Sequence, residues 1–153
     1  MVTVVDFLGN LQKVDVKSIT ETIVKEKEAR IVDLNRYDQI FLQGVDADGK
    51  SLYTYSPFTQ QFYDNDESIM DRMGENKSRF DRLNMFWTGR SYHSFQAYVR
   101  GNSLYITTDA RARKLLIQNS SDSIFGLTDR NKEIVNWEII APELNDRIRE
   151  MLL

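Results

Sequence analysis

The feature that most constrains the fold is a stripe of apolar residues near the N-terminus that repeats at helical spacing. Its members recur mostly at steps of three and four residues: Ile19, Ile23, Ile31, Leu34, Tyr37, Phe41 and Val45. Residues at this spacing share one face of an α-helix. The regular steps fail only around Lys27, so the pattern predicts either one long helix or two helices that break near residues 26–30.

Capping residues stand at both ends of this helical region. Ser18 is followed three positions later by Glu21, the spacing of a capping box, in which each side chain accepts a hydrogen bond from the other residue's backbone N–H. Gly44 is placed to end the region as a C-cap. Between them, residues 25–30 form a mixed-charge run, which predicts a solvated helix face.

Two aspartates beyond Gly44 suggest a calcium loop, because Asp46 and Asp48 precede Gly49. An EF-hand loop that began at Asp46 would need Gly at its sixth position and a bidentate Glu at its twelfth. Ser51 and Pro57 occupy those positions, so the loop fails. Asp48-Gly49 predicts a tight turn instead, since Gly takes a positive φ without steric cost.

The second half of the chain contains the clearest strand signal. Residues 94–99 alternate in polarity, a turn follows over residues 101–103, and the chain returns through residues 104–108. This pattern predicts a β-hairpin. The alternation places Phe95, Ala97 and Val99 on one face of the first strand and its polar positions and Tyr98 on the other.

Helices are expected on the C-terminal side of the hairpin. Asp109 is placed to cap a helix over residues 110–117, and Thr128 to cap the last helical region. Pro142 is expected to split that last region in two, because an internal proline loses a backbone hydrogen bond and clashes with the preceding turn. The apolar stripe of the region consists of Ile134, Val135, Ile139, Leu144, Ile148 and Leu152.

These elements together predict an α+β fold. It comprises an N-terminal helix or helix pair, a small antiparallel sheet, and C-terminal helices packed on one face. With 153 residues, the chain is expected to form a single domain over residues 1–153. Residues 58–82 are charged and poor in aliphatic side chains, and they predict an extended loop or arm within that domain.

Composition excludes several classes of function. The chain has no cysteine, which excludes a thiolate zinc site, an iron–sulfur cluster and a cysteine nucleophile. Its net charge of −3 argues against nucleic-acid or membrane binding driven by net charge. No apolar run approaches the roughly 20 residues of a membrane helix, and the N-terminus lacks the basic region of a secretory signal.

Catalytic signatures are weak. His93 is the only histidine, and the Gly-rich, nucleophile-elbow and zinc-helix motifs do not occur. We therefore predict no catalytic residue, no metal site, no cofactor and no enzyme. Two alternatives remain open at this stage: a small enzyme that uses His93 with Asp or Glu partners, and a host-side regulatory binding module.

A series of short motifs, in a fixed order, carries a family resemblance. A helix that ends at Gly44 is followed by Val45-Asp46-x-Asp48-Gly49. Further on come Phe86-Trp87-Thr88-Gly89, the hairpin, Lys114-Leu115-Leu116, and Ile124-Phe125-Gly126-Leu127-Thr128 before a terminal amphipathic helix. Over roughly residues 30–153 the chain resembles the tail-completion or virion-morphogenesis proteins of tailed bacteriophages, closest to those of Bacteroides-infecting and crAss-like phages.

The resemblance implies a structural virion protein, a subunit of a ring in the head–tail connector, neck or tail-terminator region. Its location would be the virion, assembled in the host cytoplasm. The implied partners are further copies of the chain and neighbouring portal, connector or tail proteins. Tight DNA binding is not expected from an acidic chain, nor is membrane binding. The residues expected at subunit or partner interfaces are Asp64, Asp66 and Glu67 in the arm and Arg111, Arg113 and Lys114 after the hairpin.

Overall fold

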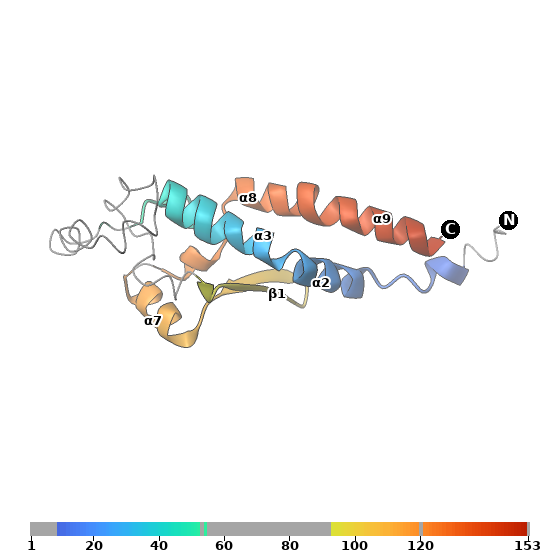
Figure 1. Cartoon of the computed structure of the whole chain (residues 1–153), viewed down its shortest axis with the longest axis horizontal. Coiled ribbons are helices and arrows are strands. Elements are labelled where there is room, and N and C mark those ends of the chain that lie inside the picture. The colour runs from blue at the N-terminus through green and yellow to red at the C-terminus, as the bar shows by residue number, and fades with distance from the viewer. Residues whose placement is uncertain (1–8, 53, 55–92, 120, 153) are drawn as a thin grey trace.

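The computed structural model describes residues 9–52, 54, 93–119 and 121–152 (Figure 1). Helices predominate, and one two-stranded antiparallel sheet occurs in these residues, so the α+β prediction is confirmed. The expected arm over residues 58–82 lies outside the described residues. The elements in chain order are α2 (Val16–Glu26), α3 (Glu28–Asp33), the π-helix η1 (Leu34–Gln43), β1 (Gln96–Arg100), β2 (Ser103–Thr107), α7 (Ala110–Asn119), the 3₁₀-helix η3 (Asp122–Phe125), α8 (Asp129–Glu133), the π-helix η4 (Ile134–Ile140) and α9 (Ala141–Leu152).

The N-terminal helical region breaks once, as the second of the two expected arrangements. α2 ends at Glu26, Lys27 leaves helical geometry, and α3 then runs directly into η1. The predicted capping box is wrong, because Asp15 caps α2 by accepting a hydrogen bond from the Ser18 backbone N–H at 3.1 Å. Asp15 therefore accepts the Ser18 N–H that the capping box assigned to the Glu21 side chain, and α2 begins before Ser18. Gly44 does end the region, with φ at +66°.

The hairpin matches its predicted alternation. Phe95 and Ala97 are buried and Val99 is partly buried, whereas Gln96 and Tyr98 are exposed. The turn is shorter than expected, because Ser103 already belongs to β2 and only Gly101 and Asn102 connect the strands. Gly101 has a φ of +65°, which a residue with a Cβ rarely adopts.

Pro142 does not split the C-terminal helical region. α8, η4 and α9 follow one another without an intervening residue, and Thr128 caps the start by accepting from the Asn131 backbone N–H, as predicted. The helix instead widens into a π-helix just before the proline. Backbone hydrogen bonds there join residues five positions apart, as from the Ala141 N–H to the Asn136 carbonyl. This change in hydrogen-bond spacing falls next to Pro142, which has no N–H to donate.

The two long helical regions pack side by side and antiparallel (Figure 1). Ion pairs tie them together: Glu26 with Arg147, Lys27 with Glu143, and Arg30 with Glu138. The charged run over residues 25–30 is therefore not simply the solvated face that its pattern predicts. Beneath these pairs, α2 and α3 contact β1, and one hydrophobic core joins the helices, the hairpin and η3. Its fully buried members include Ile31, Ile40 and Ile124.

Candidate functional site

The two edges of the hairpin have different surroundings. On the outer edge of β1, the Ala97 backbone N–H donates to Glu28 Oε1 at 3.0 Å, so a carboxylate from α3 ends the sheet on that side. On the other side, the sheet of the described residues ends at β2. Glu28 was not expected here, since its charged run predicted a solvated face. Only the tertiary packing of α3 against β1 reveals its role.

A groove runs along the outer edge of β2, and we call it the β2 groove. It has a volume of about 270 Å³. Residues from the hairpin, α7, η3 and the segment that follows η3 line it, among them Leu104, Ile106, Arg113, Asp122, Phe125 and Gly126. A molecule in this groove would therefore lie beside the edge of β2 at which the sheet of the described residues ends.

Two buried amides of η1 fix the far wall of the β2 groove. Asn35 Nδ2 donates to the carbonyls of Ile124 at 2.9 Å and Gly126 at 2.8 Å. Gln39 Nε2 also donates to the Gly126 carbonyl at 3.0 Å, while its Oε1 accepts from the Thr128 N–H at 2.9 Å. Both side chains are completely buried. Three donated hydrogen bonds and one accepted bond therefore hold this wall against η1, and Asn35 Oδ1 is the one buried oxygen of the two amides that accepts no hydrogen bond from the described residues.

The Asp46 turn supports the same wall from another direction. Asp46 Oδ1 accepts from the backbone N–H groups of Asp48 and Lys50, as the tight-turn prediction requires, and its Oδ2 accepts from the Ser123 hydroxyl at 2.9 Å. Burial alone would raise the pKa of Asp46. The hydrogen bonds from Lys50, Ser123 and Asp48 outweigh that effect and lower the pKa below its ordinary value.

The wall has no room for a side chain at position 126, so only glycine fits there. A Cβ on Gly126 would lie 2.7 Å from the Cβ of Ala47, in the Asp46 turn. The backbone of Ala47 is itself held against η3, because its N–H donates to the Ser123 carbonyl at 3.0 Å. The turn over residues 46–50 and the segment after η3 therefore approach more closely than any side chain at position 126 allows.

The basic residues predicted at an interface all lie exposed on α7, and Arg113 lines the β2 groove. Its guanidinium carbon stands 5.4 Å from the centre of the Phe125 ring, and its Nη2 lies 3.5 Å from Asp122 Oδ1. Arg113 is therefore oriented by an aromatic face and a carboxylate. Arg111 and Lys114 do not line the groove, and the acidic residues Asp64, Asp66 and Glu67 lie outside the described residues.

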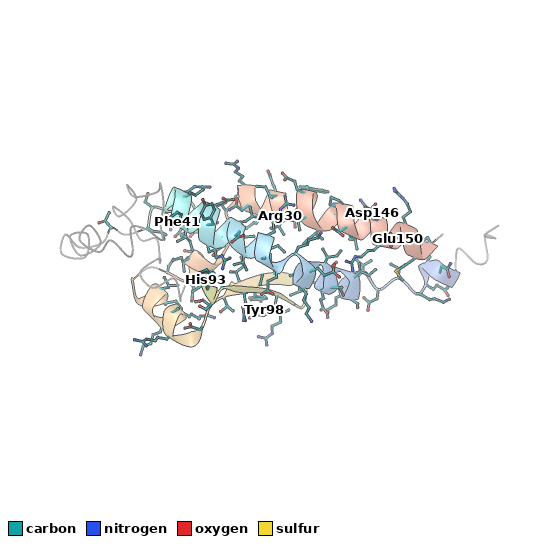
Figure 2. All side chains as sticks on the ribbon, viewed as in Figure 1. Arg30, Phe41, His93, Tyr98, Asp146 and Glu150 are labelled. Atoms are coloured by element: carbon teal, nitrogen blue, oxygen red, sulfur yellow. The ribbon has the colours of Figure 1, made fainter. Side chains whose placement is uncertain are left out.

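A pair of tyrosines forms the outer face of the hairpin. Tyr98 on β1 and Tyr105 on β2 are directly opposed in the register, and their rings stack with centroids 5.7 Å apart and planes 14° apart. Each is 44 % exposed. Tyr98, labelled in Figure 2, falls on the polar face in the sequence pattern. Its pairing with Tyr105 could be found in the sequence only by counting across the Gly101-Asn102 turn.

Other candidate chemistry is sparse in the part of the chain that the structure describes. His93 is exposed just before β1 (Figure 2). No cluster of His, Asp and Glu among the described residues is arranged to hold a metal ion. A second, mainly apolar cavity of about 480 Å³ lies between α2, the hairpin turn and η4, lined by residues that include Val24, Leu104 and Ile140.

Comparisons of the chain with protein-family models, with curated proteins and with solved structures found no match. Within the described residues, none of the helices has the length and apolar character needed to cross a membrane.

Proposed function

We propose that this chain is a structural virion protein, a subunit of a ring in the head–tail connector, neck or tail-terminator region of a tailed phage. The observation that carries the proposal is the outer side of the hairpin. There the strand edge at which the sheet of the described residues ends, two stacked tyrosines and the basic helix α7 lie together. The ordered motifs over residues 30–153 supply the phage context by resemblance.

The exposed groups on this side favour protein contact over chemistry on a small substrate. Tyrosine and arginine are enriched where proteins bind one another, because they combine apolar area with hydrogen-bonding groups. Tyr98, Tyr105 and Arg113 are all accessible. The surface beneath them is held in place by Asn35 and Gln39, so little ordering of the backbone would oppose binding there.

The proposed partners are other copies of the chain and the neighbouring portal, connector or tail proteins, within the virion. Arg111, Arg113 and Lys114 on α7 are the cations that we assign to these contacts, with Asp64, Asp66 and Glu67 as the acidic counterpart. Strong phosphate contacts would oppose the passage of DNA through a ring, and the net charge of −3 fits a subunit that avoids them.

Negative-stain microscopy of the purified chain tests this function, both alone and after co-expression with proteins encoded by neighbouring genes. We expect closed rings of uniform diameter, and we expect the combined Arg111→Glu, Arg113→Glu and Lys114→Glu variant to lose them. The matched control reverses three exposed lysines elsewhere, Lys13, Lys17 and Lys25, and should keep them. Absence of rings and of any virion partner in all preparations would contradict the proposal.

Binding to duplex DNA provides a second test. We expect the purified chain to show no submicromolar affinity in a fluorescence-anisotropy titration at physiological salt. Submicromolar binding would contradict a structural role in a ring that lets DNA pass. It would favour a nucleic-acid function instead.

A further inference from the structure

The register of the hairpin shows which backbone groups lie on its outer edges. A two-residue turn makes Arg100 and Ser103 a hydrogen-bonded pair, and in an antiparallel ladder such pairs alternate with non-hydrogen-bonded ones. Val99 opposite Leu104 and Ala97 opposite Ile106 are then the non-hydrogen-bonded pairs. The backbone groups of these residues point outward, as the Ala97 N–H does toward Glu28.

The same alternation directs the N–H and C=O groups of Leu104 and Ile106 to the outer edge of β2. Folded proteins normally protect such an edge with a charged side chain, a proline, a bulge or a covering element. β2 runs Ser-Leu-Tyr-Ile-Thr over Ser103–Thr107 and has none of the first three. The β2 groove provides open space beside it.

We propose that the outer edge of β2 is a self-pairing site, at which the β2 strand of a second copy of this chain adds in antiparallel orientation. The register follows from the positions of the unpaired groups. With Tyr105 on a twofold axis, Leu104 lies opposite Ile106 of the second copy and Ile106 opposite its Leu104. Each of these two pairs exchanges two N–H to O=C bonds, so all outward groups of both residues are satisfied. The two hairpins become one four-stranded sheet.

The tyrosine pair supports this occupant. In the twofold register the two copies of Tyr105 are directly opposed and on the same face, since opposed side chains of an antiparallel pair share a face. Each Tyr105 already stacks on Tyr98 of its own hairpin. Pairing therefore extends two exposed stacks into one row of four rings across the outer face of the sheet.

Charge also favours a second copy of this strand. The Ser103–Thr107 segment has no acidic or basic side chain, and the charged residues that line the groove beside it, Arg113 and Asp122, are of opposite sign and paired with each other. Two copies therefore meet along β2 without like charges on the paired strands. The β1 edge complements β2 less well, because Glu28 already accepts the Ala97 N–H that an added strand would need. Within the hairpin, the edge that remains to complement β2 is β2 itself.

This inference goes beyond the proposed function and does not depend on it. A twofold contact uses the same patch on both copies and closes after two. A ring requires head-to-tail contacts between different patches, and reversal of the two α7 cations outside the β2 groove, Arg111 and Lys114, tests these contacts separately. A ring without β2 pairing would overturn only this inference, and a dimer without rings would overturn only the proposed function.

Cysteine cross-linking tests the pairing directly, because the chain contains no cysteine of its own. In the proposed register the two Tyr105 Cα atoms lie about 4.5 Å apart, within the range that a disulfide can bridge. We expect Tyr105→Cys to form a covalent dimer under mild oxidation. Tyr98→Cys is the matched control: it is equally exposed on the same face, but its two copies would lie about 14 Å apart, three strand spacings. Equal cross-linking of the two variants, or none in Tyr105→Cys, would overturn the proposal.

Sedimentation analysis of the unlinked protein supplies the second measurement. We expect a monomer–dimer equilibrium for the unsubstituted chain. Tyr105→Lys places two like charges opposite each other on the axis and should weaken the dimer at least tenfold. Tyr98→Lys also loses the stack but keeps the charges apart, so it should weaken the dimer clearly less. A monomer at all concentrations, or equal effects of the two substitutions, would overturn the self-pairing site.

Discussion

The two edges of the hairpin differ in what completes them. At β1, a carboxylate from the neighbouring helix accepts the outward N–H of Ala97, so the chain itself ends the sheet. At β2, the outward groups of Leu104 and Ile106 face a groove. A small sheet can thus be closed on one side by its own fold and left able to pair on the other. The difference indicates that the β2 side is where this chain meets a partner.

The support behind the two edges differs as well. At the β1 edge, one side chain, Glu28, accepts the outward N–H of Ala97. Behind β2, three buried polar side chains fix η3 and the segment after it: Asn35, Gln39 and Asp46. Substitutions in this support should therefore cost more folding free energy than opening the β1 edge, and four predictions follow from that order.

The largest effect is expected for Gln39→Leu. Leucine fills similar space but leaves the Thr128 N–H without its partner and removes a donor from the Gly126 carbonyl. An unpaired buried group and a lost hydrogen bond together should lower the free energy of unfolding by about 3 kcal/mol, measured by urea denaturation. The control is Gln96→Leu, an exposed position on the hairpin, which should change stability by less than about 0.5 kcal/mol. Equal effects would show that the buried amide does not hold the wall.

Asp46→Ala should rank next. It removes the acceptor for three hydrogen bonds at the turn and η3, and we expect a loss of about 2 kcal/mol at neutral pH in the same denaturation assay. Asp46→Asn keeps an acceptor oxygen for the two backbone N–H groups and should lose less.

The difference in stability between the unsubstituted chain and Asp46→Asn should depend on pH. Because the folded state lowers the pKa of Asp46, the ionised carboxylate contributes stability above its unfolded pKa, near 4. That contribution is lost as the pH falls through the lower, folded pKa. The advantage of the unsubstituted chain over Asp46→Asn should therefore be present at pH 7 and shrink below about pH 4. An advantage that stays constant with pH would contradict this role of the carboxylate.

Gly126→Ala should cost about 1–2 kcal/mol, because the new methyl group overlaps the Cβ of Ala47. The pairing of these two residues can be tested by a double-mutant cycle in thermal denaturation. Ala47→Gly removes the overlapping Cβ, so Gly126→Ala should cost clearly less in that background. Additive effects would place the strain of Gly126→Ala elsewhere.

The smallest of the four effects is expected at the closed edge. Glu28→Ala should lower the free energy of unfolding by about 1 kcal/mol, the net value of one typical hydrogen bond. Its more specific consequence is faster amide hydrogen exchange at Ala97. Glu28→Gln retains an acceptor oxygen and should keep most of the protection. If neither variant changes exchange at Ala97, Glu28 does not close the edge.

Much of the local structure could be predicted from the sequence, because its signals act over a few residues. The alternation from Phe95 to Val99, the left-handed Gly44 and the caps at Asp109 and Thr128 depend mainly on nearest neighbours. The tight turn at Gly49 belongs to the same group.

The remaining features depend on contacts distant in sequence. Asp15 and Ser18 are both good capping residues, and the sequence alone does not decide between them. The role of Glu28 arises only when α3 meets β1, 69 positions away. Arg113 was among the predicted interface residues, but its position at the β2 groove depends on the fold of η3, which buried amides from η1 determine.

Residue-resolved amide hydrogen exchange at several protein concentrations tests the difference between the two edges most directly. We predict that the amides of Leu104 and Ile106 exchange rapidly in dilute solution and become protected as the concentration rises, because a second β2 strand covers them. Ala97 should show the same protection at every concentration, since Glu28 within the same chain accepts its N–H. Exchange at Leu104 and Ile106 that does not change with concentration, while the protein stays folded, would contradict the account.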